Sequence, residues 1–211
     1  DLINEKNAIG VLLYGSIVSG RIHERSDVDI ATIYDADEST YPLREEKFLE
    51  GIRVDIWRYP ISEIIHTFED EQYRGKTNSW VKTSLFVELM RSCQIMKDPH
   101  GKLAEWKDKA KEWLWKDNEI NPVLDQFRDH LLLLKEVLAE KDQFGALLCL
   151  RDTTALLVCI CLMKHNMVPT WMPKDPVYTL ISPLKKEGQQ EVIDLFLLVN
   201  GLDYIELTSF R

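Results

Sequence analysis

The pattern of apolar and polar residues divides the chain into a first part of short strands and a later part of longer helices. Residues 9–14 and 30–34 are short, largely apolar runs that predict buried strands. Residues 53–59 alternate between apolar and polar side chains, as a half-buried strand does. The stretch 45–49 fits either another strand or a turn of helix. The first part of the chain therefore predicts an α/β arrangement.

Apolar residues recur at helical spacing in the remaining sequence. Pro60 opens one predicted helix, and a longer helical pattern covers residues 80–96. A turn cluster occupies residues 97–101. Beyond it, helical patterns cover residues 103–116, 121–138, 144–165 and 186–199. We expect the chain to divide at the turn cluster, into an α/β domain of residues 1–100 and an α-helical domain of residues 101–211.

Composition and charge narrow the class of protein. The chain has 211 residues, of which 45% are hydrophobic, an ordinary fraction for a soluble globular protein. Its formal net charge of −9 argues against a large nucleic-acid surface, because phosphate contacts need clustered Lys and Arg. The longest wholly apolar run, Ala155–Met163, has nine residues, too few to span a bilayer as a helix. We therefore expect neither a membrane span nor a nucleic-acid partner.

Cysteine and histidine spacing shows no sign of a metal site. The four cysteines form no C-x-x-C pair, and the five histidines form no pair at metal-ligand spacing. Buried, reduced thiols are the simpler interpretation, and they predict a cytoplasmic location. Because residue 1 is Asp, native residues could precede it.

The chemistry-bearing residues gather around the predicted strands. Asp27 and Asp29 lie two apart at the start of a strand, so both side chains point to one face. Two adjacent negative charges are costly unless a cation neutralises them, which indicates a divalent metal. Gly15 and Ser16 follow the first strand and precede a short helical stretch, where backbone N–H groups and a hydroxyl can bind phosphate. These features together indicate metal-assisted chemistry on a nucleotide.

Further candidates have competing structural interpretations. Asp55 lies opposite Val54 and Ile56 on its strand, so it is either a third metal ligand or a solvent-facing carboxylate. Arg21 can reach donor phosphates or lie in a solvated loop. A polar interruption of the helical pattern at residues 151–154 is expected to line a cleft.

The motif resembles the nucleotidyltransferase superfamily that includes DNA polymerase β and the aminoglycoside nucleotidyltransferases. The shared signature is Gly15-Ser16, ten residues, Ser26-Asp27-x-Asp29, and a later carboxylate, matched by Asp55. The resemblance implies a small mixed sheet followed by an α-helical bundle, closest in layout to the kanamycin-type enzymes. It also implies the site residues, with Asp27, Asp29 and Asp55 as catalytic residues and ligands of two Mg²⁺ ions, and Gly15, Ser16, Arg21 and Ser26 as nucleotide-binding residues.

The function that this resemblance implies is transfer of a nucleoside monophosphate from a nucleoside triphosphate such as ATP to a hydroxyl of a small-molecule acceptor. Pyrophosphate is released, and an aminoglycoside-like antibiotic is one candidate acceptor. Two alternatives remain open. The chain is a non-catalytic nucleotide-binding or antitoxin-like partner subunit, or it transfers the nucleotide to a protein side chain. The acceptor, the base preference, the general base and the oligomeric state, including a homodimer, are left open by the sequence.

Overall fold

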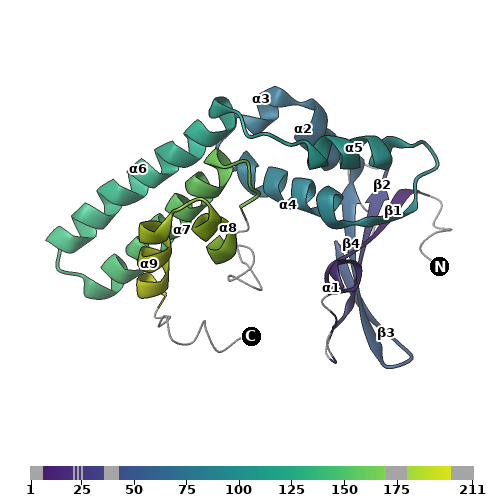
Figure 1. Ribbon diagram of the computed structural model, residues 1–211, viewed down its shortest axis with the longest axis horizontal. Coiled ribbons are helices and arrows are strands. Elements are labelled where there is room, and N and C mark those ends of the chain that lie inside the picture. Colours follow the sequence, from purple (N-terminus) through teal and green to yellow (C-terminus); the bar gives the residue numbers. More distant parts are fainter. Residues whose placement is uncertain are drawn as a thin grey trace. The chain divides into compact units, whose positions relative to one another are not determined.

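The computed structural model describes residues 7–20, 22, 24, 26–35, 43–169 and 180–200 (Figure 1). The chain forms two compact units. The sheet unit comprises Asp1–Arg74 and Leu85–Trp113, and the helical unit comprises Gly75–Ser84 and Leu114–Arg211. The predicted division into domains 1–100 and 101–211 stays a prediction.

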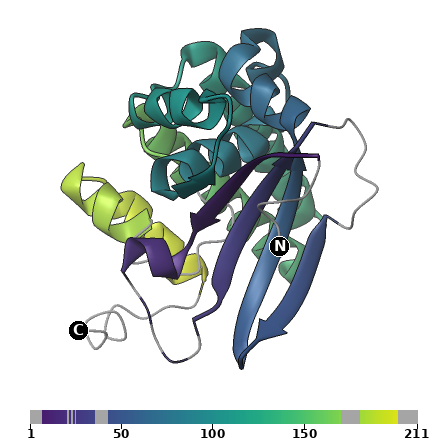
Figure 2. The ribbon, with the colours of Figure 1, turned by 90° about the vertical axis from the view of Figure 1, so that its right-hand side faces the viewer.

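The sheet unit is built on a five-stranded mixed sheet in the order β3-β4-β2-β1-β5, and Figure 2 shows neighbouring strands side by side. Strands β2 and β4 run parallel, and the other neighbours are antiparallel. This confirms the expected small mixed sheet. The strands are β1 (Ala8–Tyr14), β2 (Val28–Tyr34), β3 (Arg44–Leu49), β4 (Ile52–Pro60) and β5 (Gln94–Lys97). The helices that belong wholly to this unit are α1 (Ser16–Ser19), α2 (Ile61–Glu69), α3 (Glu71–Arg74) and α5 (Lys102–Lys111).

Helix α5 and the later part of helix α4 (Ser79–Ser92), which belongs to the sheet unit from Leu85 on, pack on one face of this sheet. Gly10 in β1 lies so close to Leu103 of α5 that an added Cβ would come 2.3 Å from its Cδ1 atom. The rings of Tyr59 in β4 and Phe86 in α4 pack edge to face, with centroids 5.2 Å apart. Leu12 of β1 is fully buried. The sheet and its helices therefore enclose an apolar core that holds the strands in a fixed register.

Strand β5 corrects the sequence prediction. The helical pattern of residues 80–96 predicted one helix, but α4 ends at Ser92 and residues 94–97 form a strand. Apolar spacing in so short a segment does not distinguish a helix from a strand, and hydrogen bonding to the edge of β1 decides the outcome. Of the two interpretations left open for residues 45–49, the structure confirms the strand, since they lie in β3.

The helical unit packs its later helices around one another. Its helices are α6 (Asp117–Ala139), α7 (Gln143–Lys164), α8 (Ser182–Lys186) and α9 (Gln190–Val199), together with the first turns of α4. A core of buried side chains joins α7, α8 and α9: Val158, Leu162, Leu180, Leu184, Ile193 and Leu197.

Two helix boundaries follow from local capping. Helix α6 begins at Asp117, four residues before the predicted start, because the Glu119 side chain accepts a hydrogen bond from the Lys116 N–H at 3.0 Å. The predicted start at residue 121 was therefore wrong, and Pro122, which follows it, lies inside the helix. Helix α7 begins after Asp142, whose carboxylate accepts from the Gly145 N–H at 2.9 Å.

Helix α7 is, among the described residues, the one helix with the length and apolar composition of a membrane span. Of the most apolar stretch of this helix, 50% is buried inside the protein. A core helix meets the same criteria. The expectation that the chain has no membrane span, drawn from the shorter run Ala155–Met163, stays a prediction.

The core of the helical unit offers a matched stability test. Leu197 is 3% exposed and its neighbour Leu198 is 77% exposed on the same helix. Leu197→Ala should lower the free energy of unfolding by about 2–5 kcal/mol, because it leaves a cavity. Leu198→Ala should change it by less than about 0.5 kcal/mol. Urea denaturation of both variants measures the difference, and equal effects would contradict this packing.

Candidate functional site

Three carboxylates converge at one end of strands β2 and β4. Asp27, Asp29 and Asp55 each place an oxygen within 4.8 Å of the others. Asp29 and Asp55 are direct partners in the parallel β2–β4 register, and Asp27 precedes β2 on the same face as Asp29. The expected convergence of the three side chains is thereby confirmed.

The donor set fits a divalent cation that prefers oxygen. Three carboxylates are the ligands that Mg²⁺ and Mn²⁺ take, whereas softer ions prefer Cys or His. Asp29 is 8% exposed and Asp55 is 4% exposed. The Oδ1 atom of Asp55 is buried and has no hydrogen-bond partner among the described residues. A buried carboxylate oxygen of this kind is costly, so a bound cation would stabilise it.

Two arginines neutralise part of this charge. Arg44 of β3 donates to Asp55 Oδ2 at 2.8 Å, and Arg53 of β4 pairs with Asp27. Arg53 also lies 3.9 Å from Asp55 Oδ2. The hydrogen bond to Asp27 raises the pKa of Arg53. Both guanidinium side chains are about half exposed, at 49% and 44%, so they can move into solvent or toward a ligand.

The sequence analysis missed both arginines. Arg53 lies two residues before Asp55 on the same strand, so period-two spacing signalled that the two side chains share a face. Arg44 had no such signal, because only the pairing of β3 with β4 brings it near Asp55. Its guanidinium lies 5.2 Å from the centre of the Trp57 ring, which holds it over the sheet.

Tyr14 is a further neighbour that the sequence analysis missed. It is the direct partner of Asp29 in the β1–β2 register. Burial raises the pKa of Tyr14 well above its usual range, and Tyr59 and then the three carboxylates raise it further. Burial also raises the pKa of Tyr59, to about 12. Tyr14 therefore keeps its proton and presents an uncharged hydroxyl beside the carboxylates.

The Gly15–Ser16 turn lies directly against this cluster. Gly15 has a φ of +78°, and a Cβ added there would come 2.1 Å from Asp29 Oδ2. Ser16 is the first residue of α1, as expected for a residue near the helix start, and its Oγ is buried with no hydrogen-bond partner among the described residues. The turn thus brings its backbone against the Asp29 carboxylate, and the residue that follows Gly15 carries an unused hydroxyl.

The structure says less about the other two predicted nucleotide-binding residues, Ser26 and Arg21. Ser26 immediately precedes Asp27 and is partly exposed. Arg21 lies outside the described residues. The catalytic, metal-binding and nucleotide-binding roles assigned from the sequence stay predictions.

Comparisons with known proteins agree with this arrangement. Residues 2–66 match the family model described as polymerase beta, nucleotidyltransferase. A solved structure, the nucleotidyltransferase-like protein from Exiguobacterium sibiricum 255-15, aligns with a TM-score of 0.55 and 8% sequence identity, over 92% of this chain and 61% of that one. The chain thus spans about 61% of that protein's length. A search of curated proteins found no match.

The two matches show the nucleotidyltransferase fold and support the superfamily that the motif predicted. The family match contains the Gly15–Ser16 turn and all three carboxylates. At 8% identity, the solved structure shows the fold alone.

The close approach of Gly15 to Asp29 predicts a large cost for any side chain there. Gly15→Ala should lower the free energy of unfolding by about 2–5 kcal/mol, from the left-handed backbone and the collision together. Gly20 is the matched control, since its φ is +73° and an added Cβ meets nothing within 4 Å. Gly20→Ala should therefore cost only about 1–2 kcal/mol. Chemical denaturation that shows equal costs would contradict the close approach of Gly15 to the Asp29 carboxylate.

Proposed function

We propose that this protein is a metal-dependent nucleotidyltransferase that moves a nucleoside monophosphate from a nucleoside triphosphate, such as ATP, to a hydroxyl of a small-molecule acceptor. The observation that carries the proposal is the convergence of Asp27, Asp29 and Asp55 within a nucleotidyltransferase fold. Three carboxylates this close repel one another, and because Arg44 and Arg53 are only half-buried, a bound cation would offset the remaining repulsion. In the reaction, the acceptor oxygen bonds to the α-phosphorus, the bond from that phosphorus to the bridging oxygen breaks, and pyrophosphate leaves.

Asp27, Asp29 and Asp55 are the residues that would hold two Mg²⁺ ions. When bound, such ions offset the charge of the phosphates and favour ionisation of the acceptor hydroxyl. The unpartnered Ser16 hydroxyl and the backbone N–H groups at the start of α1 are suited to donate to phosphate oxygens. Asp55 has the buried, unpartnered oxygen and serves as metal ligand or as base for the acceptor proton.

Arg44 and Arg53 have one role before the nucleotide binds and another after it has bound. Without nucleotide, they pair with the carboxylates that the metal would use. Three carboxylates and a triphosphate together carry more negative charge than two divalent ions offset, so the released guanidinium groups remain needed in the site. We assign them to the triphosphate, for which a planar guanidinium is a well-matched donor.

The carboxylate cluster also bears on the two alternative functions. The retained carboxylates favour catalysis over a non-catalytic nucleotide-binding or antitoxin-like partner subunit. Transfer to a protein side chain would use the same site, and the choice of acceptor in the assay separates it from small-molecule transfer. The likeness in layout to the kanamycin-type enzymes belongs to this proposal as well.

A cytoplasmic location also remains a proposal. All four cysteines are free thiols, which is the state that a reducing compartment maintains.

The catalytic proposal predicts a large effect of Asp29→Asn. The substitution keeps the shape but removes a ligand charge that matters more in the transition state than in the bound triphosphate, so turnover should fall by about a thousandfold or more. The unfolding temperature should stay similar or rise, because a like-charge repulsion is relieved. Pyrophosphate release is the assay, with ATP, Mg²⁺ and a panel of hydroxyl acceptors that begins with aminoglycosides and includes Ser and Tyr peptides.

Asp35→Asn is the matched control, since Asp35 is exposed just after β2 and away from the carboxylate cluster. It should leave turnover unchanged. Equal turnover in wild type and Asp29→Asn would remove the mechanism. Nucleotide binding by the wild type with no pyrophosphate released from any acceptor would favour the non-catalytic alternative.

The arginine assignment predicts opposite effects on two ligands. Arg53→Gln should tighten Mn²⁺ binding to the nucleotide-free protein by about two- to tenfold, because a competing ion pair is removed. The same variant should weaken binding of a non-hydrolysable ATP analogue with Mn²⁺ by about tenfold or more, because a charge-assisted hydrogen bond is lost. Calorimetry measures both.

Arg128→Gln makes the same change in net charge at a surface pair with Asp125 and should alter neither affinity. If Arg53→Gln weakens or leaves unchanged the affinity for Mn²⁺ alone, the arginine does not compete with metal. That result would not affect the nucleotidyltransferase proposal, which the pyrophosphate-release assay of the wild-type protein tests.

A further inference from the structure

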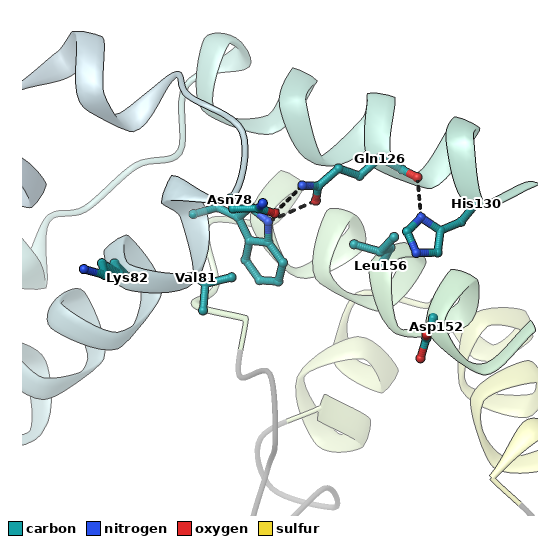
Figure 3. Close-up of a pocket in the computed structure, with 8 residues that line it drawn as sticks. Asn78, Val81, Lys82, Gln126, His130, Asp152 and Leu156 are labelled. Atoms are coloured by element: carbon teal, nitrogen blue, oxygen red, sulfur yellow. Dashed lines mark hydrogen bonds between the residues drawn. The ribbon is translucent and has the colours of Figure 1, made fainter. Parts of the chain in front are cut away.

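A ligand-sized hollow lies within the helical unit, apart from the carboxylate cluster. It has a volume of about 440 Å³ and is enclosed by the first turns of α4 and by α6 and α7 (Figure 3). This volume lies within the range typical of small-molecule sites, about 300–1,000 Å³. Asp152, from the polar interruption that was expected to line a cleft, does line this pocket. None of its lining residues belongs to the sheet unit.

One wall of the pocket is apolar and firmly held. It is formed by Trp80, Val81 and Leu156. The Trp80 Nε1–H donates to Gln126 Oε1 at 3.3 Å, and the Gln126 amide in turn donates to Asn78 Oδ1. Because these polar groups satisfy one another, the indole keeps a fixed position. Trp80 and Leu156 are buried, at 2% and 3% exposed, and Val81, at 38%, is the exposed part of this apolar wall.

The other end of the pocket offers hydrogen-bond acceptors. The His130 Nδ1 lies 2.9 Å from the backbone carbonyl oxygen of Gln126. A carbonyl oxygen can only accept, so Nδ1 carries the hydrogen, and in the neutral ring Nε2 presents a lone pair. The Asp152 side chain is exposed and has no hydrogen bond or ion pair to any residue in the described part of the chain. Figure 3 shows His130 and Asp152 at the same end of the pocket, on α6 and α7.

We infer that this pocket binds a small primary amine with an apolar body. The ammonium group donates to the Asp152 carboxylate and to His130 Nε2, and the body packs against Trp80, Val81 and Leu156. An ammonium has three donors and a positive charge, so it satisfies both acceptors, whereas an alcohol has a single donor and a carboxylate is repelled by Asp152. Lys82 also lines the pocket, but Figure 3 shows it at the end away from His130 and Asp152, so its charge lies apart from the proposed ammonium position. The site goes beyond the proposed nucleotidyl transfer and does not depend on it.

The test compares three probes of similar shape and different charge: 2-phenylethylamine, 2-phenylethanol and phenylacetate. Titration of the full chain, followed by ¹H–¹⁵N NMR shifts of the Trp80 indole and neighbouring amides, should show binding of the amine with a Kd of about 1 mM. The alcohol and the carboxylate should bind at least about tenfold more weakly. Equal binding of the amine and the alcohol would overturn the inference, as would the absence of any NMR shift at an amine concentration about ten times the expected Kd.

Two variants test the acceptors separately. Asp152→Asn should weaken the amine about tenfold or more and leave the alcohol unchanged, because only the charge is lost. His130→Asn keeps a donor for the Gln126 carbonyl but removes Nε2, and should weaken the amine about three- to tenfold. Asp129→Asn removes the same charge from an exposed position of α6 outside the pocket and should have no effect. Amine affinity unchanged in Asp152→Asn, or lowered equally in Asp129→Asn, would contradict the site.

Discussion

The repulsion among three carboxylates at one end of β2 and β4 is the constraint that organises the sheet unit. Asp29 and Asp55 lie side by side because the two strands run parallel in register, and Asp27 adds a third charge. Negative charges this close cannot remain buried without compensation. The guanidinium groups of Arg44 and Arg53 provide this compensation.

The same cluster also sets what can lie next to it. Gly15 is required because the backbone passes too close to the Asp29 carboxylate for any Cβ. Tyr14 stays protonated beside the carboxylates, since both burial and their charge disfavour its ionised form. Compensation by half-exposed arginines, rather than by buried ones, leaves the carboxylates available to a cation that binds more strongly. The arginines thus offset part of the charge without a metal, and their exposure would let a metal displace them.

The site of the helical unit is chemically different. Its pocket combines a fixed apolar wall with acceptors from Asp152 and His130, and it contains no cluster of carboxylates among its lining residues. The sheet site suits a metal and phosphates, whereas the helical pocket suits an organic cation. The two proposed sites therefore take different classes of ligand, and each proposal can be tested without reference to the other.

Local sequence determined the central strands, most of the helices and the spacing of side chains within each of them. The apolar runs predicted the central strands, and period-two spacing placed Asp27 beside Asp29 and set Asp55 on the face opposite its apolar neighbours. Only tertiary structure decided which strands pair, because hydrogen bonding between distant segments leaves no local pattern. That pairing turned residues 94–97 into a strand, brought Arg44 to Asp55 and set Tyr14 opposite Asp29. In the helical unit, packing of distant helices decided likewise that His130 and Asp152 line one pocket.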